Sequence, residues 1–376
     1  MTISYLPLPD PVTPAWLTAV LRASGFLVSG EVCAVSSTPT SAFRSVTSHL
    51  TLDYSAEVDP NLPTRLILKR NQSASWAIHA GIEETKFYQL ISRLDPSPPV
   101  TVPCYAAAYD ALSGNSYLLL HDISTTHTLP LARDMDVGVQ IQQGVPTADA
   151  LRQVIEALAQ THAYWWNHAV FASDAFPIGY WSRNAERFAL YLERRRAAWT
   201  RLVTDEADWL PDELCQLYTG VLDHLEGHWA RDLEPRFRTR THLTLVHGDA
   251  YFANFLCPTH TAEPAALLDW QSPGVGIGGY DLANLIAAFW TSEQRGDNQR
   301  EARMLQHYHH VLQTCGVQDY SHEQLQTDYQ SGLIYWLLVP VQDRNDGSPK
   351  DYWWPKMQCL VTAFREWRCG SLLGME

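Results

Sequence analysis

The sequence lacks the features that mark secreted, membrane-spanning or disulfide-bonded chains. Its start, MTISYLPLPDPVTPAWLTAVLRASG, has no basic segment followed by an apolar one, and no later apolar run is long enough to cross a membrane. The seven cysteines are scattered, odd in number and without a CxxC pair, which favours reduced thiols over a disulfide framework. We therefore expect a cytoplasmic protein that is neither secreted nor inserted in a membrane.

Positive charge is also scarce. Lys and Arg total 27 against 41 Asp and Glu, a formal net charge of −14. This balance argues against nucleic acid or an anionic membrane as a partner, so an anionic ligand must meet cations that are arranged locally. No repeat at a solenoid period and no low-complexity tract interrupts the chain. With 376 residues, 46% of them hydrophobic, it can bury a large core and is long enough for two lobes.

The first third of the chain predicts a small α+β lobe. Patterning favours strands over 44–54, 64–70 and 116–123, and helices over 13–24 and 80–94.

The rest of the chain is mainly helical by pattern. Residues 150–168 carry an apolar stripe at helical spacing that includes His162, which we interpret as a core imidazole bonded to a nearby backbone group. Further helices are predicted over 183–202, 211–233, 296–315, 321–338 and 355–370.

One strand-rich insert interrupts these helices. A strand over 242–246 leads into the polar loop that begins with His247, and a second strand over 265–270 ends near Asp269. The glycine-rich residues 271–279 follow, then a helix over 280–290. We interpret GVGIGG as a flexible bend, because it lacks the GxGxxG spacing of a dinucleotide-binding βαβ unit. Function concentrates at such interruptions, so this hairpin is the candidate active site.

The polar residues of the hairpin suit phosphoryl transfer. Asp249, Asn254 and Asp269 supply two carboxylates and an amide, the hard oxygen ligands that Mg²⁺ accepts together with phosphates. The loose transition state of phosphoryl transfer needs an aligned alcohol, neutralised charge and a positioned metal. Asp249 would accept the proton of a substrate hydroxyl, while Asn254 and Asp269 would hold the metal.

A kinase also needs a cation on the phosphates. Lys69 ends the predicted strand LILK, and Glu84 near the start of the next helix is placed to pair with it. The neighbouring Arg65, Arg70 and Glu83 are interpreted as solvated charges.

These motifs carry a family resemblance. HGDxxxxN followed by LLDW and YDLA, with an upstream LILK strand and ExxFY helix, resembles the aminoglycoside phosphotransferase and choline kinase-like family, the small-molecule relatives of protein kinases. The similarity covers most of the chain and includes YLLLHD and LAQTHAYWW. A weaker match of YHHVLQTCGV and YSHEQLQTDY resembles the ecdysteroid-kinase-like branch.

The resemblance implies an α+β, two-lobed protein-kinase-like fold. It implies a small mixed N-lobe with an antiparallel sheet over 1–123, including the hinge strand, and a large, mainly helical C-lobe over 124–376. The implied activity is ATP- and Mg²⁺-dependent phosphorylation of a hydroxyl on a small-molecule alcohol. The oligomeric state and the choice between ATP and GTP stay open.

The resemblance also assigns roles to individual residues. Asp249 is implied as the catalytic aspartate, and Asn254 and Asp269 as the metal ligands. Lys69 is implied to contact the α- and β-phosphates with Glu84 as its partner, while main-chain groups around Leu120 to Asp122 read adenine. His247 is implied to brace the loop, and Asp281 to hold the backbone of that loop.

One segment departs from the family pattern. The phosphate-covering loop should lie near residues 36–46, which contain no glycine although glycine lets backbone amides approach phosphates most closely. Ser41, Arg44 and Ser45 are the candidate substitutes. This departure keeps an alternative open, a catalytically weak or inactive nucleotide-binding protein on the same fold.

The sequence also allows two other kinds of metal site, and it leaves the class of acceptor open. A metal hydrolase using His247, Asp249 and Asp269 would need more histidines at matching spacing, and a zinc site at Cys257 and His260 lacks a second ligand pair. Residues 339–356 mix aspartates such as Asp343 with aromatic residues such as Tyr352, a combination that suits a cationic or amino-bearing alcohol. An amino sugar, an amino alcohol, a sugar and a sterol-like alcohol all remain candidates.

Overall fold

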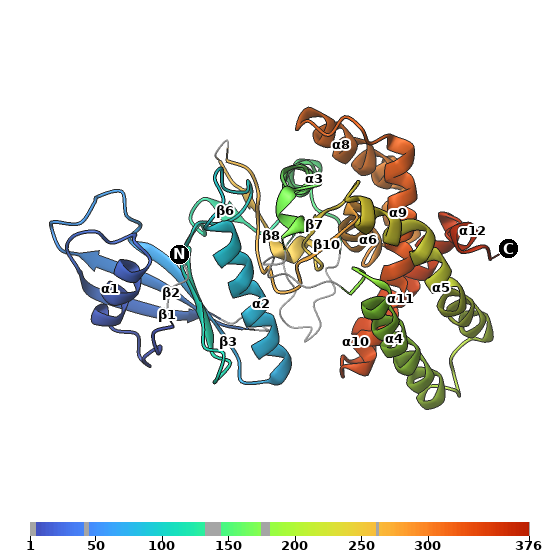
Figure 1. Ribbon diagram of the computed structural model, residues 1–376, viewed down its shortest axis with the longest axis horizontal. Helices are drawn as coiled ribbons and strands as arrows, with labels where there is room; N and C mark the ends of the chain where they lie inside the picture. Colours follow the sequence, from blue (N-terminus) through green and yellow to red (C-terminus); the bar gives the residue numbers. More distant parts are fainter. Residues whose placement is uncertain (1–4, 41–44, 132–143, 174–180, 261–262, 376) are drawn as a thin grey trace. The chain divides into compact units, whose positions relative to one another are not determined.

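A computed structural model describes residues 5–40, 45–131, 144–173, 181–260 and 263–375 (Figure 1). The chain divides into two compact units, Met1–Thr128 with Pro258–Pro273, and Leu129–Cys257 with Gly274–Glu376. The predicted lobes, 1–123 and 124–376, stay a prediction. The division in the structure differs from them because the segment that carries Asp269 belongs to the first unit.

The first unit is built on a five-stranded antiparallel sheet. Its strands are β1 (Val32–Thr40), β2 (Ser45–Tyr54), β3 (Arg65–Asn71), β4 (Cys104–Tyr109) and β5 (Ser116–His121), in the order β1-β2-β3-β5-β4. The short strands β6 (His127–Thr128) and β9 (Ala266–Leu267) complete the strands of this unit. The α+β class and the antiparallel N-terminal sheet are confirmed.

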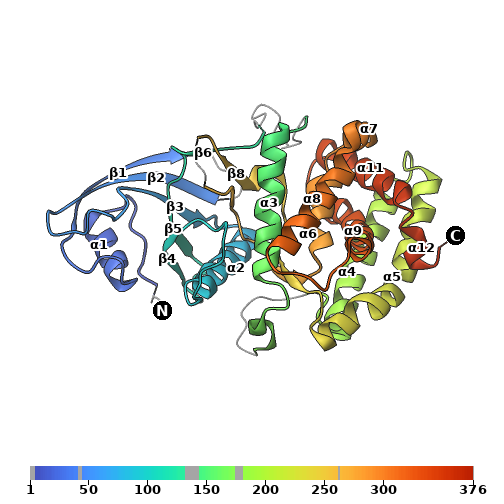
Figure 2. The same cartoon turned by 90° about the horizontal axis from the view of Figure 1, so that it is seen from above.

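Alternation along the central strand separates the two faces of this sheet. Leu66 and Leu68 of β3 are buried in a core with Leu17 and Val20 of α1 (Pro14–Ala23). Because successive side chains of a strand point to opposite faces, Lys69 lies on the other face, where α2 (Ser75–Ile91) packs against β3, β4 and β5 (Figure 2). Strand geometry therefore aims Lys69 at α2.

The sheet contains two strands that the sequence does not predict. The edge strand β1 reads VCAVSSTPT, a polar stretch with a proline that only an edge strand tolerates. The other, β4, has three alanines in CYAAAY, and alanine favours strands weakly. Both depend on pairing with neighbours that local patterning does not reveal.

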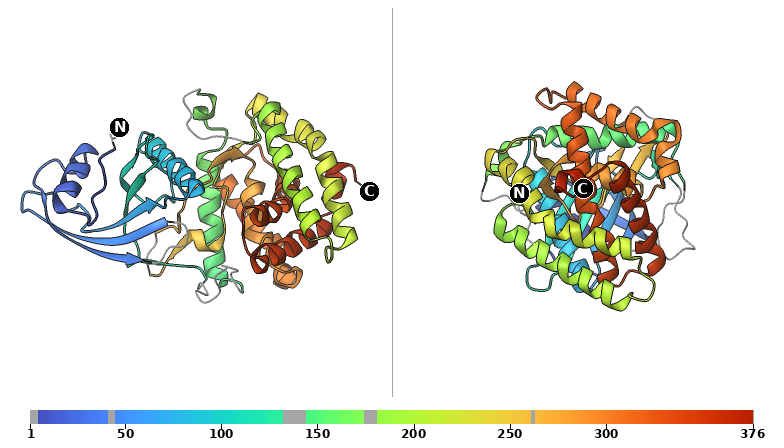
Figure 3. Two further views of the ribbon diagram at one scale, coloured as in Figure 1. Left: turned by 90° about the horizontal axis from the view of Figure 1, so that it is seen from below. Right: turned by 90° about the vertical axis from the view of Figure 1, so that its right-hand side faces the viewer.

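The second unit is mainly helical. Its longer helices are α3 (Ala148–Tyr164), α4 (Ala185–Asp205), α5 (Asp212–Thr239), α6 (Gly278–Ala287), α8 (Arg300–Thr314), α9 (His322–Leu337) and α11 (Lys350–Glu366). The shorter ones are α7 (Ser292–Gly296), α10 (Val339–Asn345), α12 (Gly370–Leu373) and the single turns η1 (Ala169–Ala172), η2 (Phe252–Asn254) and η3 (Asp297–Gln299). Within this unit α4 packs on α5, α12 lies against α5, and α11 packs on α9 (Figure 3).

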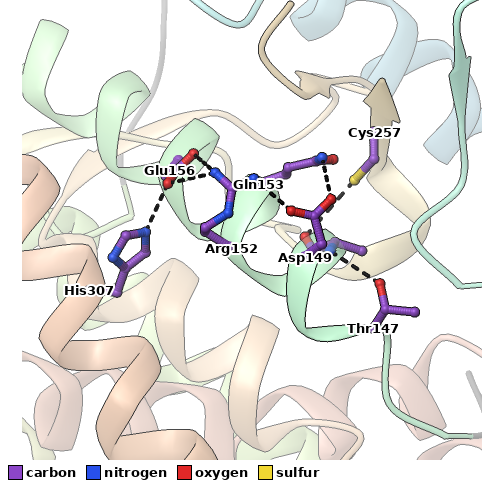
Figure 4. Close-up of polar contacts among 8 residues, drawn as sticks. Thr147, Asp149, Arg152, Gln153, Glu156, Cys257 and His307 are labelled. Carbon is purple, nitrogen blue, oxygen red and sulfur yellow. Dashed lines mark hydrogen bonds and ion pairs between the residues drawn. The ribbon is translucent and has the colours of Figure 1, made fainter. Parts of the chain in front are cut away.

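The helix α3 forms where the apolar stripe predicts it. Leu151, Val154, Ile155 and Leu158 are all buried, and α3 packs along α8. Thr147 caps the start of the helix, because its hydroxyl accepts a hydrogen bond from the Ala150 N–H at 3.3 Å (Figure 4).

The glycine-rich segment 274–279 differs from its prediction as a flexible bend. Of the residues predicted as a flexible bend, the first three form the strand β10 (Gly274–Gly276), which pairs antiparallel with β7 (Thr244–Val246), Val275 opposite Leu245. Gly278 and Gly279 begin α6. Glycines weaken a strand by propensity, and here pairing with a buried neighbour overrides that preference. The strand β8 (Phe255–Pro258) follows the polar loop.

No helix within the described ranges is long and apolar enough to cross a bilayer. All seven cysteines are free thiols.

The helices α6 and α9 cross at two glycines. A Cβ at Gly279 would lie 2.0 Å from the carbonyl oxygen of Asp328, and one at Gly332 would lie 2.1 Å from the carbonyl oxygen of Gly279. Side chains larger than hydrogen cannot fit, so this contact sets the position of α6 and of the polar residues in its first turns.

We predict that Gly279→Ala destabilises the protein by about 2 kcal/mol or more, because the obstacle is backbone and cannot rotate away. Urea unfolding should show a lower midpoint. Gly296→Ala is the control, since its Cβ meets nothing within 4 Å and should leave stability unchanged or slightly raised. Equal stabilities of the two variants would contradict the prediction.

Candidate active site

Three of the predicted site residues meet within the first unit. The Lys69 ammonium donates to Glu84 Oε1 at 2.8 Å and lies 2.6 Å from Oε2, and it also donates to Asp269 Oδ1. Lys69 comes from β3, Glu84 from α2, and Asp269 from the turn after β9. The structure thus brings together one cation and two carboxylates that are far apart in the sequence.

Burial and charge act against each other at this cluster. Burial by itself would lower the pKa of the Lys69 ammonium, but Asp269 and Glu84 outweigh that effect and raise it, so the lysine stays charged. Burial raises the pKa of the Glu84 carboxyl to about 7, with Lys69 acting in the opposite direction and Asp269 adding to the rise. Glu84 is only 2% exposed, and its charge therefore depends on Lys69.

Aromatic stacking and backbone contacts hold Asp269 in this cluster. The indole of Trp270 stacks on Phe87 with ring centroids 4.0 Å apart, and Phe87 lies one helical turn from Glu84. The Leu267 N–H donates to the carbonyl oxygen of Val100 at 3.0 Å, which ties β9 to the first unit. Asp269 itself adopts φ +65°, a left-handed conformation that aspartate tolerates better than most residues.

In the second unit a buried carboxylate holds the polar loop. Asp281 is fully buried in the first turn of α6, and its Oδ2 accepts the His247 N–H at 2.6 Å while its Oδ1 accepts the Gly248 N–H at 2.9 Å. Gly248 has φ +82°, so the sharp turn there needs glycine. The Asp281 carboxylate therefore fixes the position of the backbone at residues 247–248, just before Asp249.

His162 supports this anchor from α3. Its Nε2 lies 3.1 Å from Asp281 Oδ2, and its Nδ1 lies 2.7 Å from the hydroxyl of Tyr308 on α8. The expected backbone partner is therefore wrong, since the imidazole binds two side chains. A neutral imidazole protonated on Nε2 satisfies both contacts, donating to Asp281 and accepting from Tyr308.

The loop then turns back on itself at Asp249. The Asp249 carbonyl oxygen accepts the Tyr251 N–H at 3.0 Å and the Asn254 amide N–H at 2.8 Å. Asn284 of α6 donates to the Asp249 carboxylate Oδ1 at 3.4 Å. Because the Asn254 nitrogen is used inside the loop, its amide oxygen is the atom it can offer to a metal.

The structure adds residues that the sequence analysis missed. Phe87, Trp270, Tyr308 and Asn284 all position the candidate site residues, yet none was singled out. A partial signal existed for Phe87 and Trp270, which lie inside the ExxFY and LLDW motifs. Tyr308 begins the segment YHHVLQTCGV and Asn284 directly follows YDLA, but the partners of both residues lie far away in sequence.

The predicted nucleotide-base residues form part of the sheet. Leu120 lies opposite Ile67 of β3, and the N–H of Asp122 donates to the Arg65 carbonyl oxygen at 3.4 Å. The Asp122 carboxylate accepts from Arg65 at 2.8 Å and lies 2.9 Å from His49 Nδ1. Arg65 is therefore an ion-pair partner of Asp122, and its side chain stays 47% exposed. Base recognition by Leu120 and Asp122 stays a prediction.

Two further predicted sites are the phosphate-covering loop and a zinc site at Cys257. The strands β1 and β2 hold residues 36–40 and 45–46 of the predicted phosphate loop, while Ser41 and Arg44 lie outside the described residues. Cys257, considered for zinc, is buried, and burial raises the pKa of its thiol to about 11. Over the part of the chain that the structure covers, no group of three or more His, Cys, Asp or Glu side chains could hold a metal.

Comparisons with known proteins agree with this architecture. The profile of the APH family, described as the phosphotransferase enzyme family, matches residues 54–319. No curated protein sequence matches the chain.

Solved structures resemble the chain at low identity. A candidate aminoglycoside phosphotransferase from Ralstonia eutropha JMP134 is 14% identical with a TM-score of 0.57, over 94% of this chain and 97% of that one. Choline kinase from Cryptosporidium parvum Iowa II is 10% identical with a TM-score of 0.52, over 90% and 91%. A variant of aminoglycoside 2′-phosphotransferase-IIIa in complex with GDP is 13% identical with a TM-score of 0.50, over 95% and 98%.

The antiparallel sheet followed by a helical region thus has the α+β fold of the kinase-like phosphotransferases. The chain belongs to the APH phosphotransferase enzyme family, whose profile covers most of its length. The ecdysteroid-kinase-like branch stays a prediction.

We predict that Asp281→Asn destabilises the protein by about 3 kcal/mol, because an amide cannot accept from three donors and turns its own NH₂ toward one of them. Chemical unfolding followed by circular dichroism measures the loss. The exposed Asp208→Asn is the matched control and should unfold like the wild type. A wild-type midpoint for Asp281→Asn would show that the loop does not depend on this carboxylate.

Proposed function

We propose that this phosphotransferase is a small-molecule kinase that transfers the γ-phosphate of ATP to a hydroxyl group with the help of Mg²⁺. The observation that carries the proposal is the contact of Lys69 with both Glu84 and Asp269, since a phosphate-binding cation beside a metal-binding carboxylate is what phosphoryl transfer requires. A bound divalent ion would neutralise charge on the phosphates.

The first unit supplies the donor side in this proposal. Lys69 contacts the α- and β-phosphates, held charged and aimed by Glu84. Asp269 would offer Mg²⁺ a carboxylate oxygen from this unit, and Asn254 of the second unit would offer its amide oxygen, both hard oxygens that suit this ion. Main-chain groups around Leu120 to Asp122 contact the base.

The loop of the second unit supplies the reacting carboxylate. Asp249 accepts the proton of the substrate hydroxyl as the acceptor oxygen bonds to the γ-phosphorus. The bond from that phosphorus to the bridging oxygen breaks, and the nucleoside diphosphate leaves with the electron pair. His247 and Asp281 keep the loop in place through the backbone contacts described above.

One observation supports an alternative. The glycine-free segment 36–46 would hold phosphates less closely than a glycine-rich loop, as expected for a catalytically weak or inactive nucleotide-binding protein. The joint presence of Lys69, Asp249, Asn254 and Asp269 favours the enzyme. GTP is a second donor to test, because one of the solved structures similar to this chain, that of an aminoglycoside 2′-phosphotransferase-IIIa variant, is a GDP complex.

Asp249→Asn should strongly slow Mg²⁺-dependent phosphate transfer while nucleotide binding persists. Loss of the general base costs about 100-fold or more in kcat. Screening hydroxylated small molecules with ATP or GTP, and detecting the product by its added phosphate mass, measures the transfer. Asp319→Asn, an exposed aspartate, is the control. Undiminished transfer by Asp249→Asn would remove Asp249 from the mechanism, and nucleotide binding without transfer in the wild type would favour the alternative.

Lys69→Met should weaken binding of Mg-ATP by about tenfold or more, since it deletes a charge-assisted contact to the phosphates. A titration with a fluorescent ATP analogue measures the dissociation constant. Lys86→Met is a matched control, because Lys86 pairs with Glu83 at 2.7 Å on the same helix as Glu84. Equal affinities of the two variants would show that Lys69 has no role in nucleotide binding.

A further inference from the structure

A second buried lysine lies in the helical unit, away from the Lys69 cluster in sequence. Lys356 of α11 is 4% exposed, and its ammonium donates to Asp343 Oδ2 of α10 at 2.9 Å. Lysine is almost never fully buried unless it is paired, so this arrangement calls for an explanation.

Aromatic rings surround the same ammonium. Lys356 Nζ lies 5.1 Å from the ring centroid of Trp336, 5.3 Å from that of Tyr352 and 5.4 Å from that of Phe289. All three distances fall within the range of cation–π attraction, which strengthens when the cation is desolvated. We call Phe289, Trp336, Tyr352 and Asp343 the Lys356 cage.

The Lys356 cage adjoins the loop that carries Asp249. The ring of Tyr251, two residues after Asp249, lies 5.7 Å from the ring of Phe289. Phe289 follows α6, the helix from which Asn284 donates to the Asp249 carboxylate. Burial would lower the pKa of Lys356, but Asp343 outweighs it and raises that pKa, with Tyr352 and Asp249 adding to the effect. The Lys356 ammonium inside the cage therefore stays positively charged.

This arrangement bears on the interpretation of residues 339–356. Aspartates beside aromatic rings indicated a site for a cationic alcohol, because a carboxylate and ring faces are what a ligand ammonium needs. In the structure the chain's own ammonium has taken both the carboxylate of Asp343 and the three ring faces.

We propose that Lys356 determines the charge selectivity of the acceptor: its ammonium fills the aromatic cage next to Asp249, so the protein phosphorylates alcohols without a positive charge and rejects amino-bearing and quaternary ammonium alcohols. The proposal rests on the proposed function, because it takes Asp249 as the residue that meets the acceptor hydroxyl. Lys356 acts on the acceptor through charge and is a specificity residue.

The first experiment compares acceptors in matched pairs that differ only in carrying a hydroxyl or an ammonium group. The wild type should prefer the uncharged member in kcat/KM. Lys356→Met keeps the volume of the side chain and removes its charge, so it should shift the preference toward the cationic member by at least about tenfold. Lys350→Met, an exposed lysine 3.2 Å from the Trp209 ring centroid, is the control and should leave the preference unchanged.

A second experiment needs no phosphate transfer. Lys356→Ala removes the ammonium and its stem, leaving Asp343 and the three rings around an emptied space. Propylammonium should bind this variant, detected by calorimetry and by a rise in Tm, and should not bind the wild type or Lys356→Met, in which the space is filled.

The outcomes separate this proposal from the proposed function. Preference of the wild type for cationic acceptors, or an unchanged preference in Lys356→Met, would overturn it. If the wild type phosphorylates no acceptor with ATP or GTP, the proposed function fails, and the binding of propylammonium then tests the cage by itself. Binding confined to Lys356→Ala supports the cage assignment, and no binding to Lys356→Ala overturns it.

Discussion

A charge removed from water must meet an opposite charge or aimed hydrogen-bond donors, and this constraint explains the polar interior of both units. An uncompensated buried charge costs several kcal/mol, so each must have its partners ready. Lys69 sits between Glu84 and Asp269, Asp281 collects two backbone N–H groups and His162, and Lys356 pairs with Asp343 inside an aromatic cage. Each of these arrangements lies beside a residue that phosphoryl transfer would use.

Tight backbone packing gives these charges their positions. The glycines at 279 and 332 let α6 and α9 approach each other, which places Asp281 and Asn284 against the polar loop. In the first unit the stacking of Phe87 on Trp270 positions the neighbouring Asp269. The residues expected to touch phosphates or metal are thus held by neighbours with no chemistry of their own. Such support is what a preorganised electrostatic site requires.

Local pattern predicted much of this molecule. The apolar stripe of α3, the alternation in β2 and β3 and the apolar run of β5 are patterns that neighbouring residues set by themselves. It missed β1 and β4, and it read β10 as a bend, because these segments are polar, alanine-rich or glycine-rich and become strands only through partners elsewhere in the chain. His162 was recognised as buried, but its partners, Asp281 and Tyr308, could not be read from its own helix.

Residue type and spacing were enough to select Lys69, Glu84, Asp249, Asn254 and Asp269, because phosphoryl transfer restricts which side chains can serve. The role of Asp281 came from the family resemblance. Folding settled which of them touch, since contacts between Lys69 and Asp269, or between Asp281 and the backbone at 247–248, join segments that no local rule connects. The same holds for residues 339–356. Their composition indicates a place for a positive charge, and three-dimensional packing supplies that charge from the chain itself, through Lys356.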